Sequence, residues 1–180
     1  RDGGYYNKWD FDSDVVNRYL TSVSAACVNF VELGFRSSLP TNSFIGPYAF
    51  TTDQFIEKLD LPKGPEYGVM INGKEFVNNF SDQRNKINKL FKTKEKSPLS
   101  LVRIAINFDN SLQVESTAKL LKDMGYKVGL NMMQANGKED REYINIAKKI
   151  ELWDVVDVLY FADSLGNMSP ADVKKICKAL

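Results

Sequence analysis

Five apolar runs, separated by segments with the spacing of amphipathic helices, constrain the fold of this chain more than any other feature. The runs are rich in β-branched and aromatic residues and are apolar nearly throughout, which is typical of strands buried on both faces. They cover residues 27–36, 67–72, 101–108, 127–134 and 155–164. Each interval has room for a crossover helix. The pattern therefore predicts an α/β fold whose strands lie side by side, in chain order, in one parallel sheet.

Six helices are expected around this sheet, because apolar residues recur at helical spacing between and after the runs. They lie at 14–26, after the capping box of 51–54, around 87–91, after Ser111, around 143–150 and after Ser169–Pro170. Ser13 and Ser111 are expected to cap the first and fourth helices, because a serine hydroxyl accepts a hydrogen bond from a free backbone N–H group of the first turn. Ser169 followed by Pro170 suits the start of the sixth helix.

The composition excludes several classes of function. The chain has 24 basic and 23 acidic side chains, so its net charge of +1 gives no basis for electrostatic binding to nucleic acid or to a membrane surface. It has no histidine, which excludes histidine-based triads and histidine metal ligands within these residues. No run approaches the ~18 apolar residues that span a bilayer, and there is no signal-peptide pattern.

The two cysteines, Cys27 and Cys177, fall within apolar periodic segments and are expected to be buried thiols. One possible pair does not make a disulfide framework, which favours a reducing compartment. We therefore expect the protein in the cytoplasm.

Polar residues gather at the carboxyl end of each predicted strand. They are Glu32 and Arg36, Asn72, Asn107, Asn131 and Gln134, and Asp163 and Ser164. In a parallel α/β array these ends emerge on one side, where ligands bind. Any one of them could simply mark the end of a strand, but five strands in succession favour a binding site.

The type of α/β fold follows from a missing motif. A doubly wound sheet that binds nucleotides would carry a glycine-rich phosphate turn, and neither G-x-G-x-x-G nor a P-loop occurs. We therefore expect a TIM (β/α)8 barrel, present as an incomplete barrel of about six βα units with the first strand and the last two units missing. Residues 1–180 would form part of this single barrel domain.

Four motifs carry a resemblance to known proteins. They are Arg1-Asp2-Gly3-Gly4, the run VELGFR at 31–36, the run NMMQ at 131–134 and the run DSLGNMSP at 163–170. In this order they resemble the metal-dependent aldolase and acyl-transferase barrels, a superfamily that includes 3-hydroxy-3-methylglutaryl-CoA lyase and isopropylmalate synthase. The last run is most similar to the 4-hydroxy-2-oxovalerate aldolase branch.

The resemblance implies an activity and a role for several residues. The activity would be that of a metal-dependent carbon–carbon lyase, an aldolase that acts on a 2-oxo acid such as 4-hydroxy-2-oxovalerate through a metal-stabilised enolate. Arg1 would donate hydrogen bonds to the enolate oxygen of pyruvate or a similar 2-oxo acid. Asp2 would bind a divalent metal, Mn²⁺ or Mg²⁺, which would polarise the substrate carbonyl. The residues that would line the barrel opening at the carboxyl ends of the strands and bind substrate are Glu32, Arg36, Asn131, Gln134, Asp163 and Ser164.

The chain departs from the family pattern in its histidines. Members of the closest branch carry a histidine shortly after the Arg-Asp-Gly run as general base, and the family takes two metal ligands from a His-x-His pair on the seventh strand. This chain has Tyr5 and Tyr6 in place of the general-base histidine, and it ends before the strand that would carry the His-x-His pair. Either tyrosine could act as the base if its pKa were lowered.

Two further readings stay open beside the aldolase. One is a non-catalytic barrel domain that binds a small acidic ligand within a larger protein, which the missing histidine favours. The other is an open-sheet signalling module, which the lack of clustered acids after the first strand disfavours. The expected partner is a small-molecule 2-oxo acid rather than nucleic acid or a membrane. A homo-oligomer, or an additional domain C-terminal to these residues, is also possible on this reading.

Overall fold

The five predicted strands form one parallel sheet in chain order. The computed structural model describes residues 3–38, 44–77 and 80–180. Its strands are β1 (Phe30–Phe35), β2 (Glu66–Asn72), β3 (Leu101–Asn107), β4 (Lys127–Met133) and β5 (Val158–Ala162). Their order is β1-β2-β3-β4-β5, and all four neighbouring pairs are parallel. The predicted strands and their order are confirmed.

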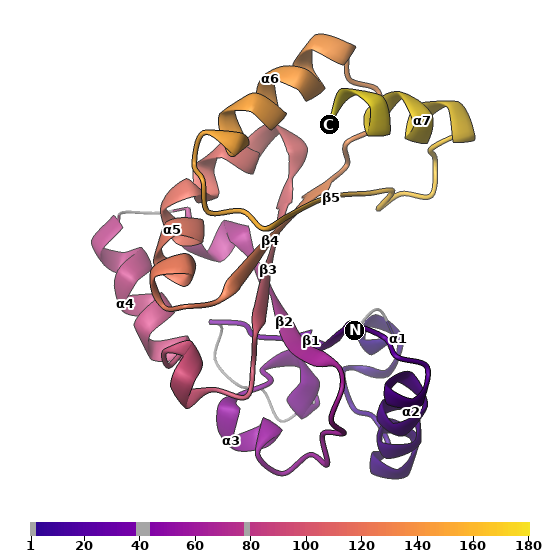
Figure 1. The fold of residues 1–180 in the computed structure, drawn as a ribbon, viewed down its shortest axis with the longest axis vertical. Coiled ribbons are helices and arrows are strands. Elements are labelled where there is room, and N and C mark those ends of the chain that lie inside the picture. The colour runs from indigo at the N-terminus through magenta and orange to yellow at the C-terminus, as the bar shows by residue number, and fades with distance from the viewer. Residues whose placement is uncertain (1–2, 39–43, 78–79) are drawn as a thin grey trace.

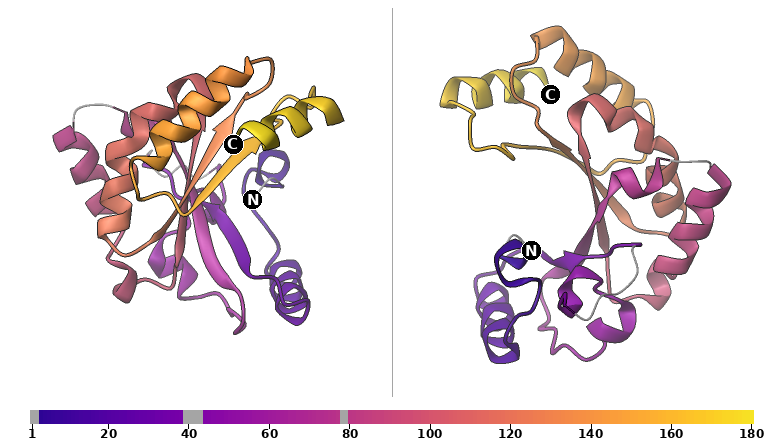
Figure 2. Two further views of the ribbon diagram at one scale, coloured as in Figure 1. Left: turned by 45° about the horizontal axis from the view of Figure 1, so that its top comes forward. Right: turned by 180° about the vertical axis from the view of Figure 1, so that it is seen from behind.

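The helices cover the outside of this sheet and leave its inner face open. They are α1 (Gly4–Asn7), α2 (Ser13–Ala25), α3 (Asp53–Ile56), α4 (Phe80–Leu90), α5 (Glu115–Asp123), α6 (Asp140–Glu151) and α7 (Pro170–Ala179). The short 3-10 segments are η1 (Pro47–Ala49), η2 (Gly73–Phe76), η3 (Lys94–Lys96) and η4 (Phe108–Val114). The described residues trace a C-shaped outline whose opening lies between α2 and α7 (Figures 1 and 2). This is an incomplete (β/α) barrel, as the sequence predicts.

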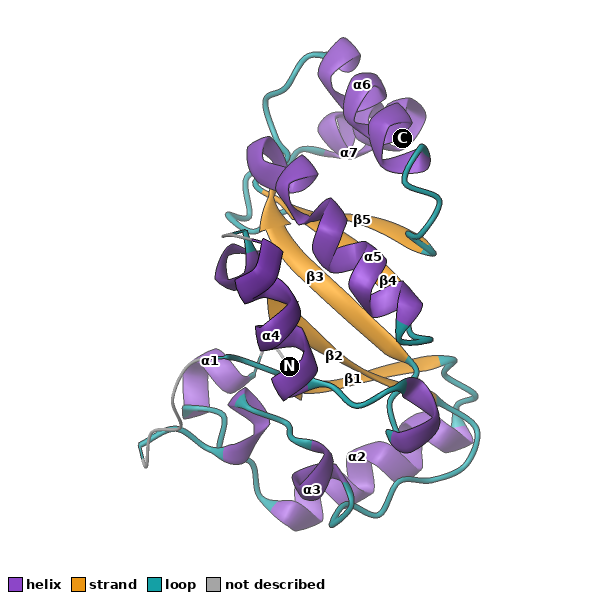
Figure 3. Ribbon diagram, turned by 90° about the vertical axis from the view of Figure 1, so that its left-hand side faces the viewer, coloured by secondary structure: helices purple, strands orange, loops and turns teal. Residues whose placement is uncertain are grey.

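The main core lies between the sheet and its helices. Alternate side chains of the central strands, such as Val69, Ile104 and Leu130, point outward and are fully buried. They belong to the same cluster as Ile87 of α4 and Leu121 of α5, the two helices that lie across the sheet in Figure 3. Because helices cover this face, its alternate strand positions must be apolar.

The inner face instead carries an ion pair that ties β1 to β3. The Arg103 guanidinium donates to both carboxylate oxygens of Glu32, at 2.8 and 2.6 Å, and its centre lies 5.4 Å from the middle of the Tyr160 ring. On β2, the partner of Glu32 is Gly68, which has no side chain, and the partner of Arg103 is Met70. Glu32 is thus paired with Arg103 inside the sheet, ahead of the carboxyl ends of the strands.

Two of the three predicted helix caps differ from the sequence predictions, and the third is confirmed. The cap of α2 is Asp12, whose carboxylate accepts from the Val15 N–H at 3.0 Å, and not Ser13. The fourth helix begins at Glu115, because Ser111 is buried inside the 3-10 turn η4. The cap of the sixth predicted helix at Ser169 is confirmed.

Both cysteines are exposed, so the prediction of buried thiols is wrong. Cys27 lies in the turn after α2 with a φ of 56°, ahead of the first residue of β1. Cys177 lies on α7, where Ile176 is the buried position. Among the residues that the structure describes, no helix is long and apolar enough to span a bilayer.

Candidate active site at the carboxyl ends of the strands

A pocket of about 580 Å³ lies on the inner face, where all five strands end. We call it the mouth pocket. Its polar lining consists of Tyr5, Asn72, Lys74, Asn107, Asn131, Asp163 and Ser164. Its apolar lining consists of Phe35, Met70, Ala105, Met133 and Ala162. A parallel barrel places its ligand at this end of the sheet, because the loops that follow the strands converge there.

Three asparagines, one from each of β2, β3 and β4, supply amide groups to the pocket. Asn72, Ala105 and Asn131 lie in register on adjacent strands, and Asn107 is two residues further along β3. The Asn72 side-chain oxygen Oδ1 accepts from the Lys74 N–H at 3.2 Å. Asn131 is 6% exposed and lines the pocket, so its amide group can form hydrogen bonds with a ligand there.

Asp163 shapes the loop after β5. One of its carboxylate oxygens accepts from the Asn167 N–H at 2.9 Å, and the other accepts from the Met168 N–H at 3.0 Å. Both oxygens are therefore engaged by the turn around Gly166, whose φ is 66°. The same loop places Ser164 in the pocket, where its hydroxyl oxygen lies 3.4 Å from the Gln134 N–H group that donates to it.

Tyr5 reaches the pocket from the other end of the chain. Its ring packs edge-on against the rings of Trp9 and Phe35, with distances between ring centres of 5.2 and 6.4 Å. Trp9 is itself held against Gly4, where an added Cβ would lie 2.4 Å from the indole ring. The N–H group of Gly46 donates to the Lys8 carbonyl at 2.7 Å, which fastens this opening loop to the segment before η1.

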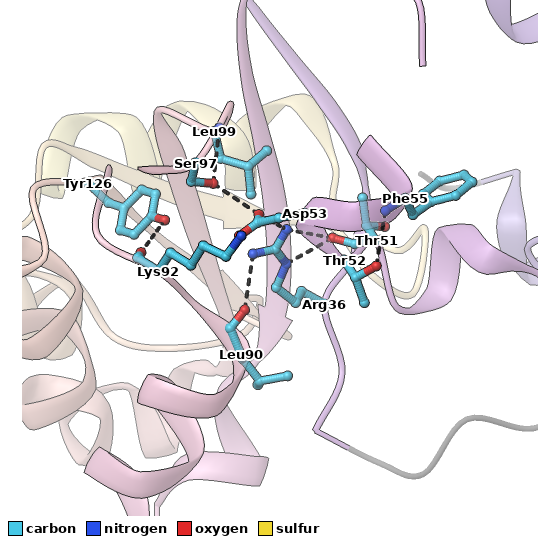
Figure 4. Close-up of polar contacts among 10 residues, drawn as sticks. All are labelled: Arg36, Thr51, Thr52, Asp53, Phe55, Leu90, Lys92, Ser97, Leu99 and Tyr126. Carbon is cyan, nitrogen blue, oxygen red and sulfur yellow. Dashed lines mark hydrogen bonds and ion pairs between the residues drawn. The ribbon is translucent and has the colours of Figure 1, made fainter. Parts of the chain in front are cut away.

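Arg36 lies on the opposite side of the sheet from the mouth pocket. Its guanidinium donates to the Thr51 carbonyl at 2.9 and 2.6 Å, to the Leu90 carbonyl at 3.1 Å and to the Asp53 carboxylate at 2.8 Å (Figure 4). It is fully buried and also contacts the face of Phe91. Asp53 accepts a further hydrogen bond from Ser97. These hydrogen bonds thus join loops on the helix side.

The cause is a β-bulge in β1 between Glu32 and Gly34. Regular alternation from the inward Glu32 would turn Gly34 and Arg36 inward as well. The extra residue reverses the alternation, so Phe35 lines the pocket and Arg36 points outward. Gly34 is required at the bulge, because an added Cβ would lie 2.2 Å from the Tyr48 carbonyl oxygen.

The structure therefore brings together some of the predicted site residues and separates others. Tyr5, Asn131, Asp163 and Ser164 share the mouth pocket. Tyr6 is 93% exposed, and Gln134 is exposed with a φ of 54°. Those that do not line the pocket are Tyr6, Glu32, Arg36 and Gln134. Arg1 and Asp2 lie outside the described residues.

Sequence reasoning did not single out Lys74 or Phe35 as site residues. Lys74 follows Asn72 by two positions, on the loop that leaves β2. The sequence sign of this position was the dipeptide Asn72-Gly73, which is typical of a turn at the end of a strand. Residues in the turn that follows a strand lie at the ligand-binding end of a parallel barrel. Phe35 could be found only by recognising the bulge.

The described residues do not form a metal site by themselves. They contain no group of three or more histidine, cysteine, aspartate or glutamate side chains placed to hold an ion. The pocket's one described carboxylate, Asp163, uses both oxygens on backbone N–H groups. A hard divalent ion needs several free oxygen ligands, so this donor set does not fit one.

Comparison with known proteins supports the fold. No family model and no curated protein matches the chain. Among solved structures, it is similar to the N-terminal domain of a putative aldolase from Bacteroides vulgatus, with a TM-score of 0.77 and 27% identity over 99% of this chain and 57% of that one. It is also similar to the carboxyl transferase domain from Rhizobium etli pyruvate carboxylase, with a TM-score of 0.69 and 12% identity over 100% of this chain and 32% of that one. The chain thus spans little more than half of the first structure.

Proposed function

We propose that this protein is a carbon–carbon lyase, an aldolase that acts on a 2-oxo acid such as 4-hydroxy-2-oxovalerate. The observation that carries the proposal is the meeting of two distant motifs in one pocket. Tyr5, directly after the motif that opens the chain, and Ser164, from the motif after β5, both line the mouth pocket. The similarity to a putative aldolase domain over nearly the whole chain supports the same activity.

The pocket suits a small acid because its lining includes hydrogen-bond donors from three asparagines, Ser164 and Lys74. Asn131 and Ser164 would hold the carboxylate and carbonyl oxygens of the 2-oxo acid through N–H and O–H groups. Tyr5 would exchange a proton with the substrate, because it lines the pocket although it is 64% exposed, whereas Tyr6 is 93% exposed and does not line the pocket. Asp163 would act indirectly, by holding the loop that carries Ser164.

Arg1 and Asp2 keep the roles that the resemblance implies, as a donor to the enolate oxygen and as a ligand of Mn²⁺ or Mg²⁺. Since the described donor set does not fit a metal, the roles given to the pocket residues above do not depend on one. Glu32 and Arg36 would have structural roles and would not bind substrate, because Glu32 is paired with Arg103 and Arg36 is paired with Asp53.

The second candidate function is a non-catalytic barrel domain that binds a small acidic ligand within a larger protein. The absence of histidine from the whole sequence favours it, because the usual residue for proton transfer near neutral pH is missing. The two candidates share the pocket and differ in whether a proton leaves the bound acid.

Enolisation of pyruvate separates them. The exchange of its methyl protons with D₂O, followed by NMR across a Mn²⁺ titration, should be accelerated by the protein. Arg1→Lys should lower the exchange rate by about 10²- to 10³-fold, the usual cost of losing a donor to a developing oxyanion. Arg141→Lys, at an exposed arginine of α6, is the matched control and should change nothing. Binding of pyruvate without exchange at any metal concentration would leave the ligand-binding domain as the better account.

A further inference from the structure

Two charged side chains line the mouth pocket among the described residues, and they differ in their partners. The Asp163 carboxylate accepts hydrogen bonds from two backbone N–H groups. The Lys74 ammonium has no hydrogen bond or ion pair to any described residue. Lys74 is therefore the cationic group of this lining that can pair with an anionic group of a ligand.

The backbone around Lys74 is fixed, although its side chain is exposed. The Asn72 side chain accepts from the Lys74 N–H, which caps the 3-10 turn η2. Gly73 lies so close to the β3 backbone that an added Cβ would be 3.1 Å from the Ala105 carbonyl oxygen. On the other side, Phe76 is fully buried. The turn thus presents Lys74 at one defined position on the pocket wall.

The neighbouring charges in these loops are engaged elsewhere. The Glu75 carboxylate accepts from the Ser38 N–H at 2.8 Å and from the Ser38 hydroxyl at 2.7 Å. Lys138, on the loop after β4, is bound to Asp109 at 2.6 Å, and this hydrogen bond raises the pKa of Lys138. Lys74 differs from Lys138 in facing the pocket with no acceptor.

From this placement we propose that Lys74 determines substrate specificity, and that the substrate is a 2-oxo acid with a second anionic group, which Lys74 binds. The proposal rests on the function proposed above and narrows its substrate class to dicarboxylic 2-oxo acids, which do not include 4-hydroxy-2-oxovalerate. The second group is a carboxylate on the part of the substrate that lies toward β2. An ammonium on a flexible stem suits a distal carboxylate, because it accepts one from several directions.

The test compares two 2-oxo acids of equal chain length. 2-Oxoglutarate ends in a carboxylate and 2-oxopentanoate ends in a methyl group, so the difference in their affinities isolates the distal charge. Isothermal titration calorimetry should show that the wild-type protein prefers 2-oxoglutarate by about tenfold, as expected for a charge-assisted contact in a partly exposed site. Lys74→Gln should reduce this preference to about onefold, and Lys74→Arg should restore most of it.

Lys89→Gln is the matched control, because it removes the same charge from an exposed lysine on α4, away from the pocket. It should keep the tenfold preference, and thermal unfolding should show that all variants are folded. If Lys74→Gln kept the wild-type preference while both acids still bound, the role of Lys74 would be overturned and the proposed function would stand. If neither acid, nor pyruvate, bound to the wild-type protein, both proposals would fall.

Discussion

At the scale of single residues, Arg36, directly after β1, and Arg103, in β3, pair their charges in different ways. Arg36 is fully buried on the helix side, where Asp53 and two backbone carbonyls take its donors. Arg103 lies on the inner face and forms a two-point contact with Glu32. A buried charge is tolerated only when it is paired and hydrogen-bonded. Arg36 meets this condition through loops that are distant in sequence.

Arg36→Ala should therefore be strongly destabilising. It leaves the buried Asp53 carboxylate without its counter-charge, which typically costs about 3–5 kcal/mol of unfolding free energy. Arg141→Ala breaks an ion pair with Glu139 at a similar distance, but both side chains are mostly exposed, so the loss should be below about 1 kcal/mol. Urea denaturation would measure both. Equal losses would mean that the Arg36 cluster contributes no more than a surface pair.

The position of Arg36 also shows where sequence reasoning reached its limit. The runs that predict the strands depend on burial by helices, and burial leaves a clear apolar pattern. The face that a polar residue occupies depends instead on the local register, which the bulge at Gly34 reverses. Tyr5 and Tyr6 could not be told apart for a similar reason, because their directions depend on the packing of Trp9. A glycine inside a strand pattern was the available sign of the bulge.

At the scale of elements, β5 is tied to the sheet at its start by the preceding residue. The Asp157 N–H donates to the Val128 carbonyl, and the Asp157 carboxylate accepts from the Val128 N–H at 2.7 Å and from the Lys122 ammonium at 2.6 Å. Burial alone would raise the pKa of Asp157, but the hydrogen bonds from Lys122 and Val128 outweigh burial and lower it. The charged carboxylate is thus favoured in the folded protein.

The stability that Asp157 contributes should depend on pH in one direction. Because its folded pKa is lowered, the contribution is fully present above the ordinary value of 3.8 and is lost as the pH falls through the lowered pKa. Asp157→Asn should cost about 1 kcal/mol at pH 7, since the carboxylate is partly exposed. Urea denaturation at pH 7 and near pH 2.5 should show this difference shrinking toward acid. A difference that is the same at both pH values would contradict the assignment.

At the scale of the whole molecule, the open barrel brings α1 and the loop after β5 to one pocket. Tyr5 enters it from α1, ahead of the sheet, and Ser164 enters it from the loop after β5, the last strand of the sheet. The strands between them contribute the asparagines and the pocket floor. A ligand bound there contacts loops from both edges of the sheet, so its binding energy stabilises the assembled fold and not one local segment.

A bound 2-oxo acid should therefore raise the unfolding temperature, and the full increase should need both α1 and the loop after β5. At about 100 times its Kd the acid adds about 2.7 kcal/mol of stability, which is about 5–10 °C for a chain of this size. Tyr5→Phe and Ser164→Ala, measured by differential scanning calorimetry at the same ligand concentration, should each reduce the shift, because each removes one hydrogen-bonding group from the pocket. Tyr6→Phe is the matched control, since Tyr6 is the neighbouring residue and is 93% exposed. If Tyr6→Phe reduced the shift as much as Tyr5→Phe, the ligand would have to lie outside the mouth pocket.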